Sequence, residues 1–322
     1  MADGTGAGPG GTAELVADIG GTNARFALFD AERGLHDIRN LATADHAGPA
    51  EAIRTYLGDR RVSSMVMAVA TPVDGDRIRF TNCPWHFSIS ELRRETGIEN
   101  LSVINDFVAQ ALAVPHLDET SLDIVRPGQR EAGWPVAVLG PGTGLGVAAL
   151  VPVGDGWRPI ASEGGHASFA PHSEREDAIL RELRKEWPHV SFERVLSGPG
   201  LLRVARSLAA IDGVSCHAET PADVTASARA GNCQACSETV RIFSAMIGSI
   251  AGDLALTFGA RGGVYLCGGV LARLGDMLDR ELLTKNFLEK GRLRTFVEPI
   301  PIATVTHPNP GLLGAAHYHP DR

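Results

Sequence analysis

The chain has 322 residues, of which 44% are hydrophobic and 21% charged, and its formal net charge is -8. This composition is typical of globular proteins and excludes a disordered or fibrous chain, while the acidic balance argues against a nucleic-acid-binding surface as a global property. The length exceeds what one hydrophobic core usually covers, so two lobes are expected.

Nothing in the sequence predicts a secreted or membrane-spanning protein. The 5 cysteines are an odd number at irregular spacings, which argues for a reducing compartment rather than a disulfide framework. Residues 1–12 are rich in Gly and Ala and lack the basic and apolar regions of a signal peptide. No run of about 18 apolar residues occurs, which a membrane span would need. We therefore predict a cytoplasmic protein with no membrane or nucleic-acid partner, and a disordered tail over residues 1–13.

The first half of the chain predicts a β-hairpin followed by alternating helices and strands. The apolar runs Leu15–Ile19 and Arg25–Asp30 flank the sequence Gly-Gly-Thr-Asn, which is typical of a hairpin. Ser90 is the expected N-cap of a short helix, and Pro115 is expected to end another. The remaining expected elements are helices over Gly48–Gly58, Ser90–Thr96 and Asp106–Val114 and strands over Val62–Ala70 and Leu101–Asn105.

The second half begins with a similar pattern. Strands over Val136–Leu139 and Val147–Val151 flank a glycine-rich turn, Gly140–Gly146. Two lobes of related topology would explain this echo of the first hairpin, and so would a chance likeness between glycine turns. Later expected elements are helices over Glu174–Trp187, Gly200–Ala209, Pro221–Ala230, Cys236–Phe258 and Leu312–His317 and strands over Val264–Cys267 and Ile302–Val305. Because strands alternate with helices, the fold class is α/β.

Three glycine-rich segments are candidates for phosphate binding. They are Asp18–Asn23, Gly140–Gly146, and the pairs Gly262-Gly263 and Gly268-Gly269 on either side of the expected strand Val264–Cys267. Any one of them alone is more typical of an ordinary hairpin than of a phosphate site. Lysine occurs only at positions 185, 285 and 290 and never after a glycine, which excludes a Walker A loop. No Gly-x-Gly-x-x-Gly separates a strand from a helix, so a dinucleotide-binding fingerprint is also absent. Phosphates would have to be held by backbone N–H groups, a metal ion or arginine.

The turns resemble motifs of a known superfamily. Leu15–Leu28, with the sequence LVADIGGTNARFAL, resembles the first phosphate motif of the sugar-kinase/actin/heat-shock ATPases. Gly140–Gly146 resembles their second phosphate motif, and Gly262–Val270 resembles their adenosine motif. Four further segments resemble the bacterial glucokinase family, and the likeness runs from about residue 14 to residue 318. These segments are Ile104–Phe107 (INDF), Glu163–His166 (EGGH), Glu193–Gly200 (ERVLSGPG) and Asn309–Gly314 (NPGLLG).

This resemblance implies a two-lobe ribonuclease-H-like (actin-like ATPase) fold. Each lobe would be a mixed sheet with helices, with the ligand cleft between the lobes. A small α/β domain is expected over residues 14–116 plus 306–322, and a large α/β domain over residues 117–305. The implied protein is a homodimeric glucokinase that uses ATP and Mg²⁺ to phosphorylate the 6-hydroxyl of D-glucose at the entry to glycolysis. The alternatives are a kinase for another hexose or amino sugar, or a sugar-sensing regulator that has kept the fold.

The acceptor site is expected where a strand becomes a helix. Asp106 projects from such a junction, where open α/β sheets bind ligands, although a helix N-cap is an alternative role. Glu163 and His166 share a short loop with two glycines, so both side chains can turn toward one point, although a loop histidine is often structural. The resemblance implies that Asp106 is the catalytic base and that Asn105, Glu163, His166 and Glu193 bind the sugar.

The donor site is expected at the glycine turns. Asp18 could hold Mg²⁺ through water, and the Thr22 hydroxyl and Asn23 amide can donate to phosphate oxygens. The resemblance implies that the phosphates and the adenosine are bound by Asp18, Gly20, Gly21, Thr22, Asn23, Gly142, Thr143, Gly144, Gly268 and Gly269.

The cysteines allow two further interpretations. Cys233 and Cys236 form a Cys-x-x-Cys pair, which could act in redox chemistry or bind zinc. Cys216 and His217 would complete a set of four zinc ligands, but there is no second Cys-x-x-Cys. The Cys-x-Cys zinc motif of the related repressor/ORF/kinase sugar kinases is absent, so zinc is not the favoured interpretation.

Overall fold

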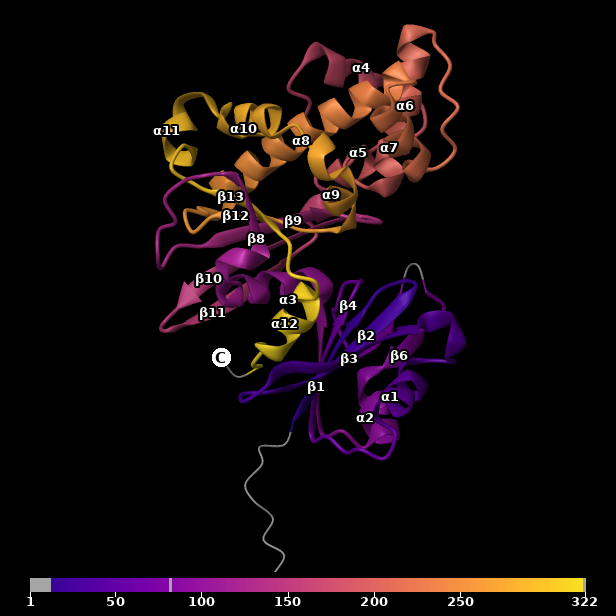
Figure 1. Ribbon diagram of the computed structural model, residues 1–322, viewed down its shortest axis with the longest axis vertical. Helices are drawn as coiled ribbons and strands as arrows, with labels where there is room; N and C mark the ends of the chain where they lie inside the picture. Colours follow the sequence, from indigo (N-terminus) through magenta and orange to yellow (C-terminus); the bar gives the residue numbers. More distant parts are fainter. Residues whose placement is uncertain (1–12, 81–82, 321–322) are drawn as a thin grey trace, which may run out of the picture. The chain divides into compact units, whose positions relative to one another are not determined.

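The structure of the protein is a computed structural model that describes residues 13–80 and 83–320. Residues 1–12 of the expected tail lie outside the described residues. The chain divides into two compact units (Figure 1). Unit 1 contains residues up to His116 and the segment from Pro308, and unit 2 contains Leu117–His307.

Unit 1 is built on a five-stranded mixed sheet with the order β3-β2-β1-β4-β7. The strands are β1 (Glu14–Ile19), β2 (Asn23–Asp30), β3 (Gly34–Ala42), β4 (Ser64–Val69) and β7 (Asn100–Asn105). β1 and β2 form the predicted antiparallel hairpin, whereas β1, β4 and β7 are parallel to one another. The carboxyl ends of β1 and β7 therefore lie at the same edge of the sheet. The sequence did not predict β3, because most of its side chains are partly or fully exposed and form no apolar run.

In the part of unit 1 that the structure describes, four α-helices accompany this sheet, together with a small antiparallel strand pair. The helices are α1 (Pro49–Leu57), α2 (Ile89–Thr96), α3 (Asp106–Ala113) and α12 (Pro310–Ala316), and the strand pair consists of β5 (Arg77–Arg79) and β6 (His86–Ser88). The expected N-cap of α2 is wrong by two positions. Ser88 has the extended backbone of a cap, and its side chain accepts the Glu91 N–H, whereas Ser90 lies inside the helix.

Helix α12 returns from the end of the chain to pack against α3 (Figure 1). The two backbones approach so closely at Gly314 that a Cβ there would overlap the carbonyl oxygen of Ala109. Beyond the ends of the two helices, the rings of His116 and His317 stack with 3.4 Å between centroids. The C-terminal segment is thus part of the core packing of unit 1.

Unit 2 is built on a six-stranded mixed sheet with the order β11-β10-β9-β12-β13-β8. The strands are β8 (Leu122–Arg126), β9 (Val136–Pro141), β10 (Leu145–Val153), β11 (Gly156–Ser162), β12 (Val264–Leu266) and β13 (Ile302–Val305). β9 and β10 are antiparallel and extend further toward each other than the sequence predicted. The glycine-rich turn is therefore confined to Gly142–Gly144. β12 lies parallel to β9, so that the carboxyl ends of these two strands are neighbours.

The helices of unit 2 surround a long central helix, α8 (Gln234–Phe258). By length and composition alone, helix α8 could span a membrane, but 83% of its most apolar 18-residue stretch is buried inside the structure. It is therefore the core helix of this unit. The helix expected over residues 174–187 ends at Leu183. The other helices are α4 (Glu174–Leu183), α5 (Phe192–Val195), α6 (Gly198–Asp212), α7 (Pro221–Ala230), α9 (Gly269–Leu274), α10 (Arg280–Leu288) and α11 (Arg294–Val297).

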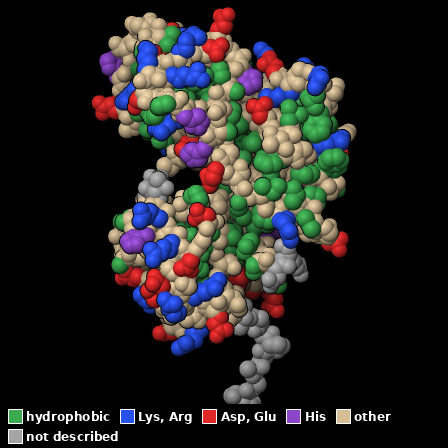
Figure 2. All heavy atoms as spheres, turned by 180° about the vertical axis from the view of Figure 1, so that it is seen from behind, with side chains coloured by type: hydrophobic (Ala, Val, Ile, Leu, Met, Phe, Trp, Pro, Cys, Tyr) green, Lys and Arg blue, Asp and Glu red, His purple; other side chains and the backbone are tan. Residues whose placement is uncertain are grey.

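Short 3-10 helices join many of these elements. They are η1 (Thr43–Asp45), η2 (Val114–His116), η3 (Glu119–Ser121), η4 (Gly164–His166), η5 (Gly275–Met277) and η6 (Gly291–Leu293). On the face seen in Figure 2, basic and acidic side chains are interspersed.

Candidate functional site

The first phosphate turn, Gly20–Thr22, joins β1 to β2 in unit 1. The Gly20 N–H donates to the Asn23 carbonyl at 2.9 Å, and the buried Thr43 fixes the turn by donating from its hydroxyl to the Gly21 carbonyl at 3.0 Å. Thr22 and Asn23 are exposed. A Cβ at Gly20 would meet only ordinary contacts, and the residue does not have a left-handed backbone. The fold of the turn therefore does not itself require glycine at this position.

Asp18 lies at the carboxyl end of β1, beside the first phosphate turn. Its side chain is 23% exposed, and Arg25 Nη1 lies 3.4 Å from its Oδ2. Burial raises the pKa of the Asp18 carboxyl, and the weaker effect of Arg25 opposes this shift. Gly311 at the start of α12 makes room for the carboxylate, because a Cβ there would lie 2.9 Å from Asp18 Cγ. The resemblance included the segment that contains Gly311, but only the structure reveals this contact with Asp18.

Asn105 and Asp106 lie at the junction between β7 and α3. Asn105 is the N-cap of α3, since its Oδ1 accepts the N–H groups of Phe107 at 2.9 Å and Val108 at 3.3 Å. Its Nδ2 donates to the carbonyl of Thr71. Asp106 is the first helical residue, so it does not have the capping role that the sequence left open. The Asn105 cap fixes the start of the helix from which the Asp106 carboxylate projects.

The second phosphate turn, Gly142–Gly144, lies in unit 2 between β9 and β10. The Gly142 N–H donates to the Gly144 carbonyl at 2.8 Å, and the Gly142 carbonyl accepts the N–H of Gly198 at the start of α6. Thr143 is exposed at the tip. The turn is closed on one side by Glu193, whose Oε2 accepts the Leu145 N–H at 3.0 Å. A Cβ at Gly144 would overlap the Glu193 carboxylate, so the close approach of this carboxylate depends on the small size of glycine.

The segment Glu163–His166, called here the EGGH loop, follows β11. The His166 N–H donates to the Glu163 carbonyl at 2.9 Å and closes the turn, and both side chains are exposed. Gly165 packs on the Leu145 carbonyl, where a Cβ would overlap the oxygen. The loop therefore lies directly against the first residue of β10.

Glu193 connects the EGGH loop to the second phosphate turn. The same Oε2 atom that accepts the Leu145 N–H lies 3.8 Å from Nε2 of His166. Local pairing fixes this arrangement, because the Phe192 N–H donates to the Ala167 carbonyl and the ring of Phe192 packs edge-on against Phe169. Three residues predicted from separate motifs, Glu193, His166 and Gly144, are thereby brought together.

Gly268 and Gly269 lie where β12 leads into α9. Gly268 has a φ of +98°, and a Cβ on it would lie 2.5 Å from the carbonyl oxygen of Pro141. This residue thus packs directly on the strand that enters the second phosphate turn. A Cβ at Gly269 would have no atom within 4 Å, so open space adjoins the backbone there.

The predicted site residues therefore form two groups. In unit 1, Asp18, the first phosphate turn and the Asn105–Asp106 junction share the carboxyl edge of one parallel set of strands. In unit 2, the second phosphate turn, the EGGH loop, Glu193 and Gly268 form one contiguous structure. A surface groove in unit 2 contains none of these residues; it is lined by Val125, Arg280, Glu281, Thr284, Lys285, Leu288, Glu289 and Arg294.

Comparison with known proteins identifies the family. The family model described as Glucokinase matches residues 15–321. The glucokinase of Paramagnetospirillum magneticum is 45% identical over 307 residues, which cover 94% of this chain and 96% of that protein. The glucokinase of Chromobacterium violaceum is 44% identical over 310 residues, or 95% of this chain and 89% of that protein.

A solved structure agrees with these relatives. The crystal structure of glucokinase from an Antarctic psychrotroph has a TM-score of 0.86 and 39% identity, and the match covers 95% of this chain and 98% of that chain. The predicted α/β class and actin-like ATPase fold are thereby confirmed. The chain belongs to the glucokinase family, a family of ATP-dependent hexose kinases.

Proposed function

We propose that this chain transfers the γ-phosphoryl group of ATP to the 6-hydroxyl of D-glucose. The position of Glu193 is the observation that carries the proposal. Its carboxylate accepts the Leu145 N–H at the second phosphate turn and lies 3.8 Å from His166 in the EGGH loop. A turn suited to phosphates and a loop suited to sugar hydroxyls are thus joined by one side chain. The glucokinases that match nearly the whole chain support the same reaction.

In this proposal Asp106 accepts the proton of the attacking hydroxyl. Its place at the junction of β7 and α3 supports this role, because open α/β sheets bind ligands at the carboxyl ends of their strands. A carboxylate is a modest base, but a loose phosphoryl-transfer transition state asks mainly for orientation and late proton removal. Asn105 supplies the orientation by capping α3.

The sugar is held by Glu163, His166 and Glu193, with Asn105 beside Asp106. A carboxylate can accept from two adjacent hydroxyls, and a neutral imidazole can both donate and accept, which suits one edge of a pyranose. Glu163 and His166 are exposed and available to a ligand. Glu193 already accepts a backbone N–H through Oε2, so its other oxygen remains the better acceptor for a sugar hydroxyl.

The phosphates are held by the two turns, and Gly268 and Gly269 line the adenosine pocket. Mg²⁺ is part of this proposal, and the Asp18 carboxylate fits a cation held through water. It is half-buried, its pKa is raised by burial, and its contact with Arg25 is long at 3.4 Å, so a nearby cation would stabilise the charged form. When bound, Mg²⁺ supplies charge neutralisation on the transferring phosphates.

Activity is expected to vanish with excess EDTA and to return when Mg²⁺ is added. The physical reason is that neither turn contains a lysine, so in this proposal the phosphate charge is met by backbone N–H groups together with a metal ion. A coupled assay of glucose 6-phosphate formation measures this directly. Full activity in the presence of chelator would contradict the role of the metal.

The Thr143 side chain is expected to act on the donor nucleotide alone. Thr143→Val keeps the shape and removes the hydroxyl, so the KM for ATP should rise about tenfold, the scale of one hydrogen bond to a charged group. The KM for glucose should stay unchanged. Thr143→Ser retains the hydroxyl and serves as the matched control. Equal ATP kinetics for the Val and Ser variants would remove Thr143 from the donor site.

The identity of the acceptor is tested with a panel of hexoses. With ATP as donor, glucose should give the highest kcat/KM among glucose, mannose, fructose, galactose and N-acetylglucosamine. A higher kcat/KM for another sugar would mean that the protein is a kinase for that sugar rather than a glucokinase. Absence of transfer to every sugar would favour the regulator alternative.

The homodimer and the cytoplasmic location also belong to this proposal. Several large hydrophobic side chains of unit 2 are exposed, among them Ile124 at 50% and Val153 at 51%, and subunit contacts commonly cover such side chains. Figure 2 shows hydrophobic side chains gathered on part of the visible face. Light scattering coupled to size-exclusion chromatography would measure the mass, and a monomer at micromolar concentration would contradict the dimer.

A further inference from the structure

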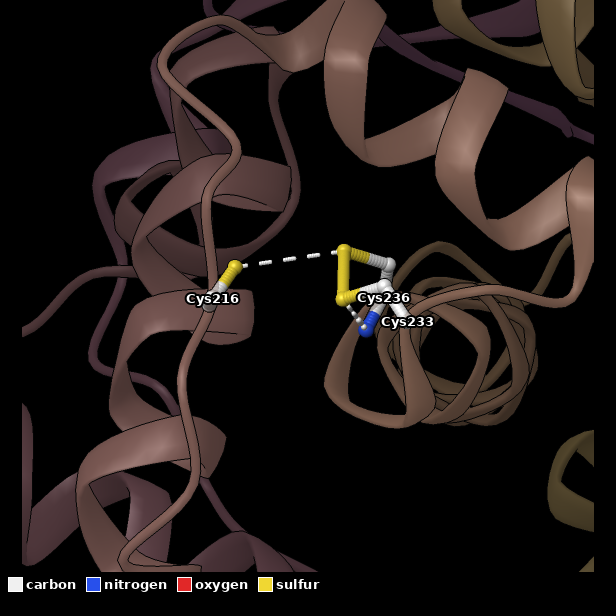
Figure 3. A group of neighbouring side chains, drawn as sticks. All are labelled: Cys216, Cys233 and Cys236. Carbon is white, nitrogen blue, oxygen red and sulfur yellow. Dashed lines mark hydrogen bonds between the residues drawn. A yellow bond between two sulfur atoms is a disulfide. The ribbon is translucent and has the colours of Figure 1, made fainter.

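Three cysteines of unit 2 lie together, and none of them belongs to the proposed site (Figure 3). Cys233 is the N-cap of α8, Cys236 is in its first turn, and Cys216 belongs to the irregular segment between α6 and α7. The sulfurs of Cys216 and Cys236 are 3.9 Å apart, and all three sulfurs lie within 4.8 Å of one another. Cys233 and Cys236 are joined by a disulfide.

Local structure brings these residues together. Thr220 begins α7 with a capping box, and Gly231, with a φ of +67°, ends it and lets the chain turn back toward α8. Cys233 and Cys236 then lie three positions apart at the start of a helix, and the Cys236 N–H donates to the Cys233 sulfur at 3.2 Å. The turn returns both residues to the segment that precedes α7, where Cys216 lies.

The surroundings of the sulfurs are apolar. Cys236 is fully buried, and Cys216 and Cys233 are partly buried against the main core of unit 2. Ala218, two residues after Cys216, and Ala235, directly before Cys236, are also buried. Bare thiolates are unfavourable in such a place, but thiolates that share a cation are not.

The position of Cys216 fits a shared cation better than exchange with the disulfide. Thiol–disulfide exchange requires approach along the extension of the S–S bond. In such an approach the three sulfurs lie in one line, with Cys236 in the middle. The Cys216 sulfur, 3.9 Å from that of Cys236, would then be about 6 Å from the Cys233 sulfur, because a disulfide bond is about 2 Å long. Instead the two sulfurs are within 4.8 Å, so Cys216 lies beside the disulfide (Figure 3). The three sulfurs form a triangle around one point.

We propose that the reduced chain binds one Zn²⁺ through the sulfurs of Cys216, Cys233 and Cys236. Sulfurs that share a tetrahedral zinc ion are about 3.8 Å apart, which matches the separation of Cys216 and Cys236. The fourth position is taken by water, because the group contains no further ligand side chain among the described residues. The Cys236 N–H, which already donates to the Cys233 sulfur, would stabilise the bound thiolate.

The disulfide is the metal-free state of the same group. Two molecules of a thiol reductant give up two electrons and form their own disulfide, while the Cys233–Cys236 bond breaks to give two thiols. Zn²⁺ then replaces the protons of the three cysteines, which are released to solvent. In the reverse direction, a small-molecule disulfide is reduced to two thiols, the Cys233–Cys236 bond forms again and Zn²⁺ leaves. The ion would fasten the segment between α6 and α7 to the start of α8.

Cobalt titration of the phosphine-reduced full chain tests this proposal without reference to kinase activity. With excess Mg²⁺ present to saturate any carboxylate site, one Co²⁺ per chain should give thiolate-to-cobalt charge transfer and the visible bands of tetrahedral cobalt. One equivalent of Zn²⁺ should abolish both. The chain oxidised with a small-molecule disulfide should give neither signal. Reduced chain that shows no thiolate-to-cobalt charge transfer at excess Co²⁺ would overturn the proposal.

Single substitutions distinguish a residue that binds the metal ion from one that only lies nearby. Cys216→Ser should lose about one third of the charge-transfer intensity and bind Co²⁺ at least about tenfold more weakly. Cys83→Ser changes a free, partly buried cysteine outside the group and should leave the titration unchanged. His217→Ala, at an exposed histidine next to Cys216, should also leave it unchanged. An unchanged titration for Cys216→Ser would overturn the three-sulfur site, and a weakened one for His217→Ala would overturn water as the fourth ligand.

Discussion

Asp106→Asn is expected to reduce turnover by about 10²-fold or more, the usual scale for the loss of a positioned base. The amide keeps an oxygen that can accept the Phe107 N–H, as Asp106 Oδ1 does at 3.0 Å. The N-cap of α3 is Asn105 and is untouched, so the helix should keep its start and its stability. Glucose binding measured by calorimetry should change little, because an amide also pairs with a hydroxyl.

Glu163→Gln and His166→Ala provide the comparison for this variant. Both residues lie on the EGGH loop, so both changes should mainly raise the KM for glucose and affect turnover less. Steady-state kinetics on the three variants separate a base from a binding residue. Near-normal turnover in Asp106→Asn together with an inactive Glu163→Gln would show that Asp106 is not the catalytic base and would favour Glu163 in that role.

Gly314→Ala is expected to destabilise unit 1 and, through helix α3, to lower activity. The added Cβ would overlap the Ala109 carbonyl oxygen, and this atom belongs to the backbone of α3 and cannot rotate away. Overpacking of this kind costs about 1–3 kcal/mol. The helix that must shift is the one that begins with Asp106, so turnover should fall together with stability.

Gly48→Ala is the matched control for this second variant. A Cβ at Gly48 would have no atom within 4 Å, and its φ of 179° is open to any residue. Its free energy of unfolding should stay within about 0.5 kcal/mol of the parent value. Calorimetric unfolding of both variants decides the matter, and equal transitions would show that α3 and α12 can separate without cost.

The sequence was sufficient for features that depend on local patterns. The hairpin of β1 and β2, the change from β7 to α3 and the exact limits of α7 follow from apolar periodicity and from residues that start or stop helices. β3 was missed because an exposed edge strand needs no apolar run. Ser88 and Ser90 are both good caps in isolation, and only the tertiary position of the chain selects Ser88.

In the candidate site, too, local motifs could be predicted from the sequence, whereas contacts between distant residues could not. The individual motifs could be found from their residues, but the bond between Glu193 and the Leu145 N–H joins positions 48 residues apart. The clearance that Gly311 gives to Asp18 likewise joins opposite ends of the chain. Neither spacing nor composition encodes such contacts, because they depend on how helices and sheets pack. The same holds for Cys216, which the sequence placed near the Cys-x-x-Cys pair only along the chain.

The placement of α12 has a consequence for the order in which the protein is made. A ribosome releases residues 13–116 long before Pro310–Ala316. Yet this late segment packs against α3 and provides the surface on which the Asp18 side chain lies. Unit 2 is continuous in sequence and can complete its core first, because domains generally fold as units during synthesis. The apolar surface of the unit 1 sheet and of α3 that α12 covers therefore stays exposed until the end of the chain has been synthesised. Chaperone dependence and pulse proteolysis of stalled chains should reveal this interval.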